Sequence, residues 1–103
     1  MSKLKLVAEP TFTAKVGIPV AGGDAVEVLL TFRHRTKSAL DAWVKDRGEK
    51  SDEDTFMGMV SGWELTDEFN TANVKVLLEN YIGTGIAAYR VYIDQLVQSK
   101  AKN

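Results

Sequence analysis

The fold of this chain is set by Thr11–Arg35, which reads TFTAKVGIPVAGGDAVEVLLTFRHR. Apolar residues alternate with polar or small ones in both halves of this stretch, and a period of two is typical of half-buried β-strands. The two halves are separated by the turn-forming residues Pro19 and Gly22-Gly23-Asp24. The pattern therefore predicts an antiparallel hairpin. Its apolar face carries Phe12, Ala14, Val16, Ile18, Val26, Val28, Leu30 and Phe32.

The sequence changes to helical spacing after the hairpin. Either Thr36 or Ser38 can cap a first helix, because its side-chain oxygen can accept a hydrogen bond from a free backbone N–H of the first turn. Arg47-Gly48 is the expected end of this helix. Its apolar positions are Leu40, Trp43 and Val44.

Three further helices are expected. The second begins near residues 51–52, where acidic side chains suit the positive end of the helix dipole. The third begins near residues 70–71, and Gly83-Thr84-Gly85 interrupts it, with Thr84 as the expected cap of the fourth. The inward faces are predicted to be Phe56, Val60 and Trp63 in the second helix, Val74, Leu77, Leu78 and Tyr81 in the third, and Ile86, Tyr89, Ile93, Leu96 and Val97 in the fourth.

Strands followed by helices predict an α+β fold, an N-terminal antiparallel β-hairpin packed by about four α-helices. A short strand at Leu4–Val7 would add a third to the sheet; without it, the hairpin edge could pair with a second subunit. The 103 residues are expected to form a single domain spanning 1–103, with residues 1–10 and 99–103 flexible.

The composition of the chain argues against several classes of function. The net charge is -1, from 13 basic and 14 acidic residues, so no electrostatic attraction to nucleic acid or to an anionic membrane is expected. The chain has no cysteine, which rules out disulfides and thiolate metal sites. Neither a signal peptide nor a membrane-spanning apolar run is evident, and a cytoplasmic location is expected.

No group of residues is typical of catalysis. His34 lies between Arg33 and Arg35 at the end of the second strand, and no nucleophile or orienting carboxylate is near it in sequence. The three could contact a phosphate, but we interpret them as a solvated strand end. Asp52-Glu53-Asp54 lacks the spacing and the glycine of a calcium loop. We therefore expect no enzymatic activity, no metal and no cofactor.

Aromatic residues are the main functional signal. Most should be core, but those left at the surface and rimmed by charge would mark a protein interface. Glu64, Asp67 and Glu68 would form such a rim, and Tyr92 is expected to be the most exposed aromatic because it lies off the inward face of its helix. The predicted partner-binding surface is Trp63, Leu65, Phe69, Tyr81, Tyr89 and Tyr92.

Three features together resemble the tail assembly chaperones of long-tailed bacteriophages. They are the hairpin followed by a helix opened by Thr36 or Ser38, the segment Val60–Leu65 leading into Phe69-Asn70, and Leu77-Leu78 followed by a helix that starts at Ile86. The resemblance covers roughly residues 11–97. Ile82-Gly83 departs from it, because many members carry a proline before the last helix.

The resemblance implies a non-enzymatic protein. Such a chaperone would bind the tape measure protein, keep it soluble and recruit tail tube subunits in the host cell cytoplasm, and would be absent from the finished virion. It implies neither nucleic acid nor membrane as a partner. Self-association, and a longer form of the chain made by ribosomal frameshifting, would be additional expectations. Two alternatives stay open: a structural tail component, such as a terminator or connector, and a small nucleic-acid-binding regulator supported by Arg33-His34-Arg35.

Overall fold

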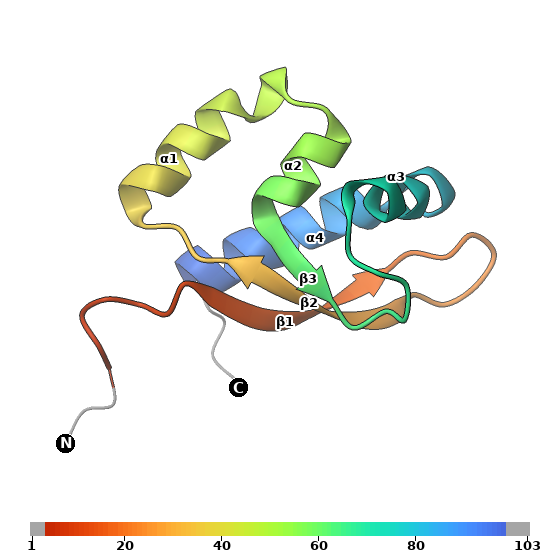
Figure 1. Ribbon diagram of the computed structural model, residues 1–103, viewed down its shortest axis with the longest axis horizontal. Helices are drawn as coiled ribbons and strands as arrows, with labels where there is room; N and C mark the ends of the chain where they lie inside the picture. The colour runs from red at the N-terminus through yellow and green to blue at the C-terminus, as the bar shows by residue number, and fades with distance from the viewer. Residues whose placement is uncertain (1–3, 99–103) are drawn as a thin grey trace.

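The computed structural model describes residues 4–98 and confirms the α+β fold. Three antiparallel strands in the order β1-β2-β3 form one sheet, and four α-helices accompany it (Figure 1). Residues 1–3 and 99–103, part of the termini expected to be flexible, lie outside the described residues. The elements are β1 (Thr11–Ile18), β2 (Val26–Arg33), α1 (Lys37–Asp46), η1 (Arg47–Glu49), α2 (Asp52–Met59), β3 (Val60–Trp63), α3 (Thr71–Asn80), α4 (Thr84–Ile93) and η2 (Asp94–Gln98).

The predicted hairpin forms with its expected face inward. Strands β1 and β2 pair along their whole length, from Thr11 opposite Arg33 to Ile18 opposite Val26. Residues directly opposite each other share a face, so the apolar residues of both strands meet on one side. Val16, Leu30 and Phe32 are fully buried there.

The third strand is not the one predicted at Leu4–Val7. Leu4–Val7 forms no strand, and the helix expected to continue through Trp63 ends at Met59. Val60–Trp63 instead forms β3, with Val60 opposite Phe32 and Trp63 opposite Leu30. The register shifts between Thr31 and Phe32, which marks a β-bulge.

The bulge explains why this strand resembled a helix in the sequence. Residues three apart in a regular strand face opposite sides of the sheet. One extra residue in β3 brings both Val60 and Trp63 to the face that carries Leu30 and Phe32. The spacing i, i+3 on one face is also the spacing of a helix, so periodicity alone favoured the wrong element.

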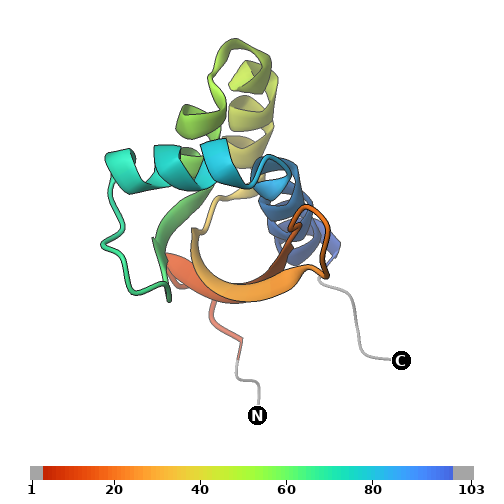
Figure 2. The same ribbon diagram turned by 90° about the vertical axis from the view of Figure 1, so that its right-hand side faces the viewer.

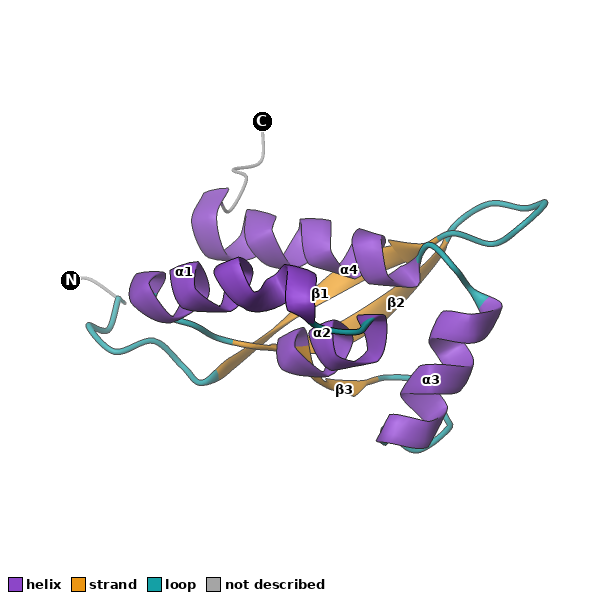
Figure 3. Ribbon diagram, turned by 90° about the horizontal axis from the view of Figure 1, so that it is seen from above, coloured by secondary structure: helices purple, strands orange, loops and turns teal. Residues whose placement is uncertain are grey.

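The helices lie on the concave side of a strongly curved sheet (Figure 2). Helix α4 runs along the hairpin, and α3 lies near the hairpin loop (Figure 3). Side chains of Thr36, Ser51 and Asn70 cap α1, α2 and α3. Thr36 is one of the two caps expected for the first helix, and Ser51 and Asn70 lie where the second and third helices are expected to begin.

Helix α4 departs from its prediction in two ways. Its N-cap is Gly83, and Thr84, expected to be the cap, is fully buried. Its fully buried residues are Thr84, Ala88 and Tyr92, whereas Ile86 and Val97 of the predicted inward face are exposed. Apolar residues surround much of this helix, so its sequence could not specify which side faces the sheet.

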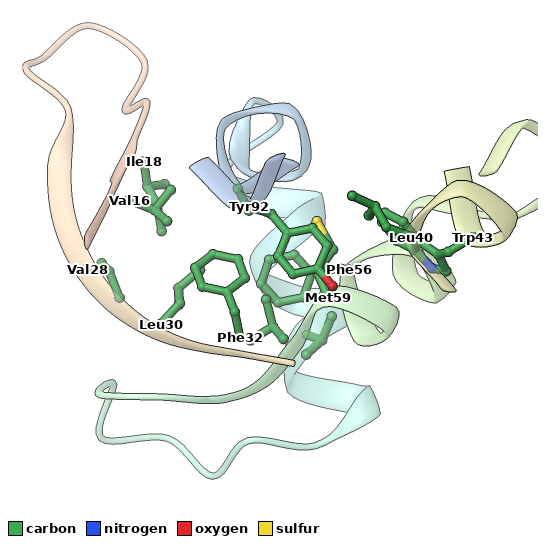
Figure 4. Close-up of a cluster of buried hydrophobic side chains, with 13 residues drawn as sticks. Val16, Ile18, Val28, Leu30, Phe32, Leu40, Trp43, Phe56, Met59 and Tyr92 are labelled. Carbon is green, nitrogen blue, oxygen red and sulfur yellow. The ribbon is translucent and has the colours of Figure 1, made fainter. Parts of the chain in front are cut away.

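The core joins the sheet to α4 through aromatic rings. The rings of Phe12, Phe32 and Tyr92 stack on one another as a triangle, with centroid distances of 5.5 Å from Phe32 to each of the other two and 6.2 Å between Phe12 and Tyr92. Trp43 of α1 meets the Tyr92 ring edge-on at 5.6 Å. Figure 4 shows Leu30 and Phe32 pointing from β2 toward this ring. Tyr92 therefore connects three elements that are distant in sequence.

Candidate functional site

Tyr92, predicted to be the most exposed aromatic, is fully buried, which corrects that prediction. Its hydroxyl donates a hydrogen bond to the Arg33 carbonyl oxygen at 2.8 Å and accepts one from the Arg35 guanidinium at 2.8 Å. A side chain in this position cannot contact a partner while the fold is intact. Tyr92 therefore belongs to the core and not to an interface.

Arg33 and Arg35 hold the end of helix α2. Arg33 Nε donates to the Met57 carbonyl oxygen at 3.1 Å, and the Arg35 guanidinium donates to the Gly58 carbonyl oxygen at 2.6 Å. The last carbonyl groups of a helix have no partners within it and carry partial negative charge, so two cations there are stabilising. The contacts give the basic cluster a structural role, which removes the sequence argument for a nucleic-acid-binding regulator.

Tyr89 is partly buried in a second aromatic group. Its ring lies 6.1 Å from that of Trp43, and the Arg47 guanidinium lies over its face at 3.9 Å. This cation–π contact links η1 to α4. The structure thus places Tyr89 beneath η1, apart from Trp63, Leu65 and Tyr81.

The remaining predicted residues gather at the loop end of the hairpin. An open groove of about 440 Å³ lies there between the hairpin and α3. We call it the hairpin groove; it is lined chiefly by Val26, Val28, Trp63, Leu65, Val76 and Tyr81.

Hydrogen bonds and ring packing fix the Trp63 wall of the groove. Trp63 Nε1 donates to the Asp67 carbonyl oxygen at 2.8 Å, and the Phe69 ring meets the indole edge-on at 5.1 Å. The Glu64 carboxylate accepts from the Leu29 N–H at 2.9 Å, which extends the sheet bonding beyond β3. Phe69 therefore supports the groove from behind Trp63 and is not among the residues that line it.

Helix α3 forms the opposite wall. The Asn70 side chain caps it by accepting from the Asn73 N–H at 2.8 Å, and Val74 anchors it in the core. Val76 and Tyr81 are left on the groove side, 57% and 39% exposed. Val76 is not among the predicted binding residues, although an apolar residue off the inward face of a helix is a signal for a second contact.

The segments that build the groove are acidic. Residues 18–29 and 60–81 carry one basic residue, Lys75, and six acidic ones: Asp24, Glu27, Glu64, Asp67, Glu68 and Glu79. Asp67 lines the groove itself. An apolar surface surrounded by one sign of charge favours partners that carry apolar and basic residues together.

A second hollow of about 360 Å³ lies where η1 and α2 meet the α3–α4 junction. Arg47, Lys50 and Asp52 line it together with Ile82 and Ile86. Its lining is more polar than that of the hairpin groove, so the hairpin groove is the better candidate for an apolar partner.

Within residues 4–98, no three His, Asp or Glu side chains are placed to hold a metal ion. No helix in the same range is long and apolar enough to cross a membrane. The apolar groove is thus the main functional candidate in the part of the chain that the structure describes.

A small α+β fold with an open apolar groove is typical of domains that bind other proteins. A family model described as phage tail assembly chaperone matches residues 1–103, and the chain belongs to this family. A search of curated proteins and a search of solved structures each gave no significant match.

Proposed function

We propose that the chain binds the tape measure protein through the hairpin groove, keeps it soluble and recruits tail tube subunits in the host cell cytoplasm. The observation that carries this proposal is the groove, whose apolar lining includes Val26, Val76 and Tyr81, each more than one third exposed. A tape measure protein is a long helical polypeptide whose apolar faces need cover before the tube forms. A groove between a sheet and a helix suits an amphipathic helix of this kind.

The proposal requires moderate affinity at each site. The groove is shallow and open, so one copy would bury a small area and release its partner readily. Many copies along one tape measure could still cover its apolar faces together, because a repetitive helical partner offers several equivalent sites and loss of one copy exposes only one of them. The binding residues proposed are Trp63, Leu65 and Tyr81, with Phe69 supporting Trp63 and Val76 added from the structure.

Co-expression with the tape measure protein from the same genome tests the proposal. The wild-type chain should raise the soluble fraction of the tape measure protein. Val76→Asp should abolish this effect, because an apolar partner in the groove would remove the new carboxylate from water without a compensating partner. Val97→Asp is the matched control, because Val97 is 62% exposed and lies outside the groove.

Two outcomes would overturn the proposal. Equal solubilisation by both variants would show that the groove is not the binding surface. Presence of the chain in purified, mature particles would favour the structural tail component instead. Circular dichroism of both variants checks that neither substitution unfolds the protein.

A further inference from the structure

The second hollow, where η1 and α2 meet the α3–α4 junction, carries two cations. We call it the junction hollow. Arg47 and Lys50 line it, both are half-buried, and neither forms an ion pair within residues 4–98. A half-buried cation has lost part of its contact with water, and here it gains no carboxylate of this chain in return. A carboxylate from outside is therefore a group that both side chains are suited to bind.

Tyr89 holds Arg47 in one orientation. The Arg47 guanidinium lies over the Tyr89 ring, with Cζ 3.9 Å from the ring centroid, while its Nε is buried and has no hydrogen-bond acceptor among the described residues. Stacking covers the face of the guanidinium and leaves the N–H groups in its plane able to donate to a carboxylate. A buried N–H without an acceptor is destabilising, so a carboxylate that accepts from it gains more than one bound to an exposed arginine. The ring also restricts the side chain before binding, which reduces the entropy lost.

Apolar side chains lie beside these cations. Ile82 is 90% exposed, Ile86 is 47% exposed, and both line the junction hollow. Exposed aliphatic side chains that are next to each other and rimmed by charge are typical of a surface that a protein partner covers. The junction hollow therefore combines an apolar wall with two cationic donors.

We propose that the junction hollow binds an acidic segment of a partner protein, in which a large aliphatic side chain lies next to a carboxylate. The carboxylate accepts from Arg47 and Lys50, and the aliphatic side chain packs on Ile82 and Ile86. Charge complementarity selects the acidic partner, and the apolar wall selects among acidic partners. The junction hollow and the hairpin groove share no lining residue, so the inference does not rest on the proposed tape measure partner.

Asp52 is the one carboxylate that lines the junction hollow within residues 4–98. It occupies the first position of α2, where the positive end of the helix dipole stabilises it, and it pairs with neither cation in this part of the chain. Its charge opposes the binding of a second carboxylate, so Asp52→Asn should tighten binding by about two- to fivefold. Partial unfolding of the variant could not produce such a gain in affinity.

Fluorescence anisotropy with a synthetic peptide tests the proposal. The probe is fluorescein-labelled Gly-Ser-Glu-Leu-Glu-Ile-Glu-Ser, and the reference peptides carry Gln for each Glu, or Ser for Leu and Ile. The wild-type chain should bind the probe at least about tenfold more tightly than either reference peptide. Lys50→Glu should weaken binding of the probe at least about tenfold, and Ile82→Ser about threefold or more. Lys75→Glu is the matched control, because it changes the net charge equally at an exposed position outside the junction hollow, and the affinity should stay within about twofold.

The Arg47 Nε–H gives a second readout, which locates the bound peptide. Its NMR signal should shift when the probe is added, and its exchange with water should slow. The Arg33 Nε–H already donates to the Met57 carbonyl oxygen at 3.1 Å, so its signal should not change. Circular dichroism verifies the fold of each variant.

Four results would overturn the proposal: no binding of the probe, equal binding of the probe and the Gln peptide, an unchanged Arg47 signal, or wild-type affinity in Lys50→Glu. Val76→Asp, which alters the hairpin groove, should bind the probe as the wild type does. Loss of tape measure solubilisation and loss of peptide binding are therefore separate results, and the two proposals can fail independently.

Discussion

Tyr92→Phe should destabilise the protein although it removes a single oxygen atom. The aromatic ring remains, so the stacking with Phe32 and the edge contact with Trp43 are retained. The hydroxyl is lost, and with it the hydrogen bond that Tyr92 donates to the Arg33 carbonyl and the one that it accepts from Arg35. The Arg33 carbonyl loses this donor in the interior, while Arg35 keeps its bond to Gly58.

The size of the effect follows from these two bonds. A hydrogen bond to a charged group contributes about 1.5–3 kcal/mol and a neutral one about 0.5–1.5 kcal/mol. Partial retention of the Arg35 contacts reduces the sum, so the free energy of unfolding should fall by about 2–3 kcal/mol. In a domain of this size, each kcal/mol lowers Tm by roughly 4–8 °C, which predicts a decrease of roughly 8–24 °C.

Urea unfolding followed by circular dichroism measures this change. Tyr89→Phe is the control, because the Tyr89 ring packs on Trp43 and Arg47 but its hydroxyl makes no hydrogen bond within residues 4–98. Its free energy of unfolding should change by less than about 0.5 kcal/mol. Equal effects of the two substitutions, or wild-type stability for Tyr92→Phe, would refute the role assigned to the buried hydroxyl.

Three further changes test the packing that positions the groove. Gly58→Ala would place a Cβ atom 2.8 Å from Trp43 Nε1. It should therefore lower the free energy of unfolding by about 1–3 kcal/mol, despite the better helix propensity of alanine. A higher Tm than that of the wild type would contradict this prediction. Asn70→Ala removes the cap of α3, so it should lower the free energy of unfolding by about 1 kcal/mol and speed hydrogen exchange in the first turn of this helix. Unchanged hydrogen exchange in α3 would contradict this role of the cap. Deletion of Ser61 removes the extra residue of the bulge and leaves Val60 and Trp63 at the two-residue spacing of a regular strand, so Trp63 should stay opposite Leu30 and the tryptophan fluorescence spectrum should be unchanged; a shifted spectrum would argue against the bulge.

Errors in the prediction of the candidate site came from two sources. Helix α4 carries more than one apolar stripe, and the stripe that faces the sheet depends on where Phe32 and Trp43 lie, so periodicity alone gives the wrong exposure for Tyr92. Val60 and Trp63 were placed on a helix because a bulged strand shares the i, i+3 spacing. Trp63, Leu65 and Tyr81 were named correctly as neighbours in space, yet the groove between them also needs Val26 and Val76.

The sequence by itself determined the hairpin, the starts of the first three helices near residues 36–38, 51–52 and 70–71, and the order of the helices, because these depend on residues close together along the chain. Only the tertiary structure decided the third strand, the burial of Tyr92 and the hairpin groove. Each of these requires pairing or packing between segments more than 25 residues apart, such as Leu30 with Trp63 and Arg33 with Tyr92. Local periodicity contains no information about such pairs, since one spacing of apolar residues is compatible with several partners.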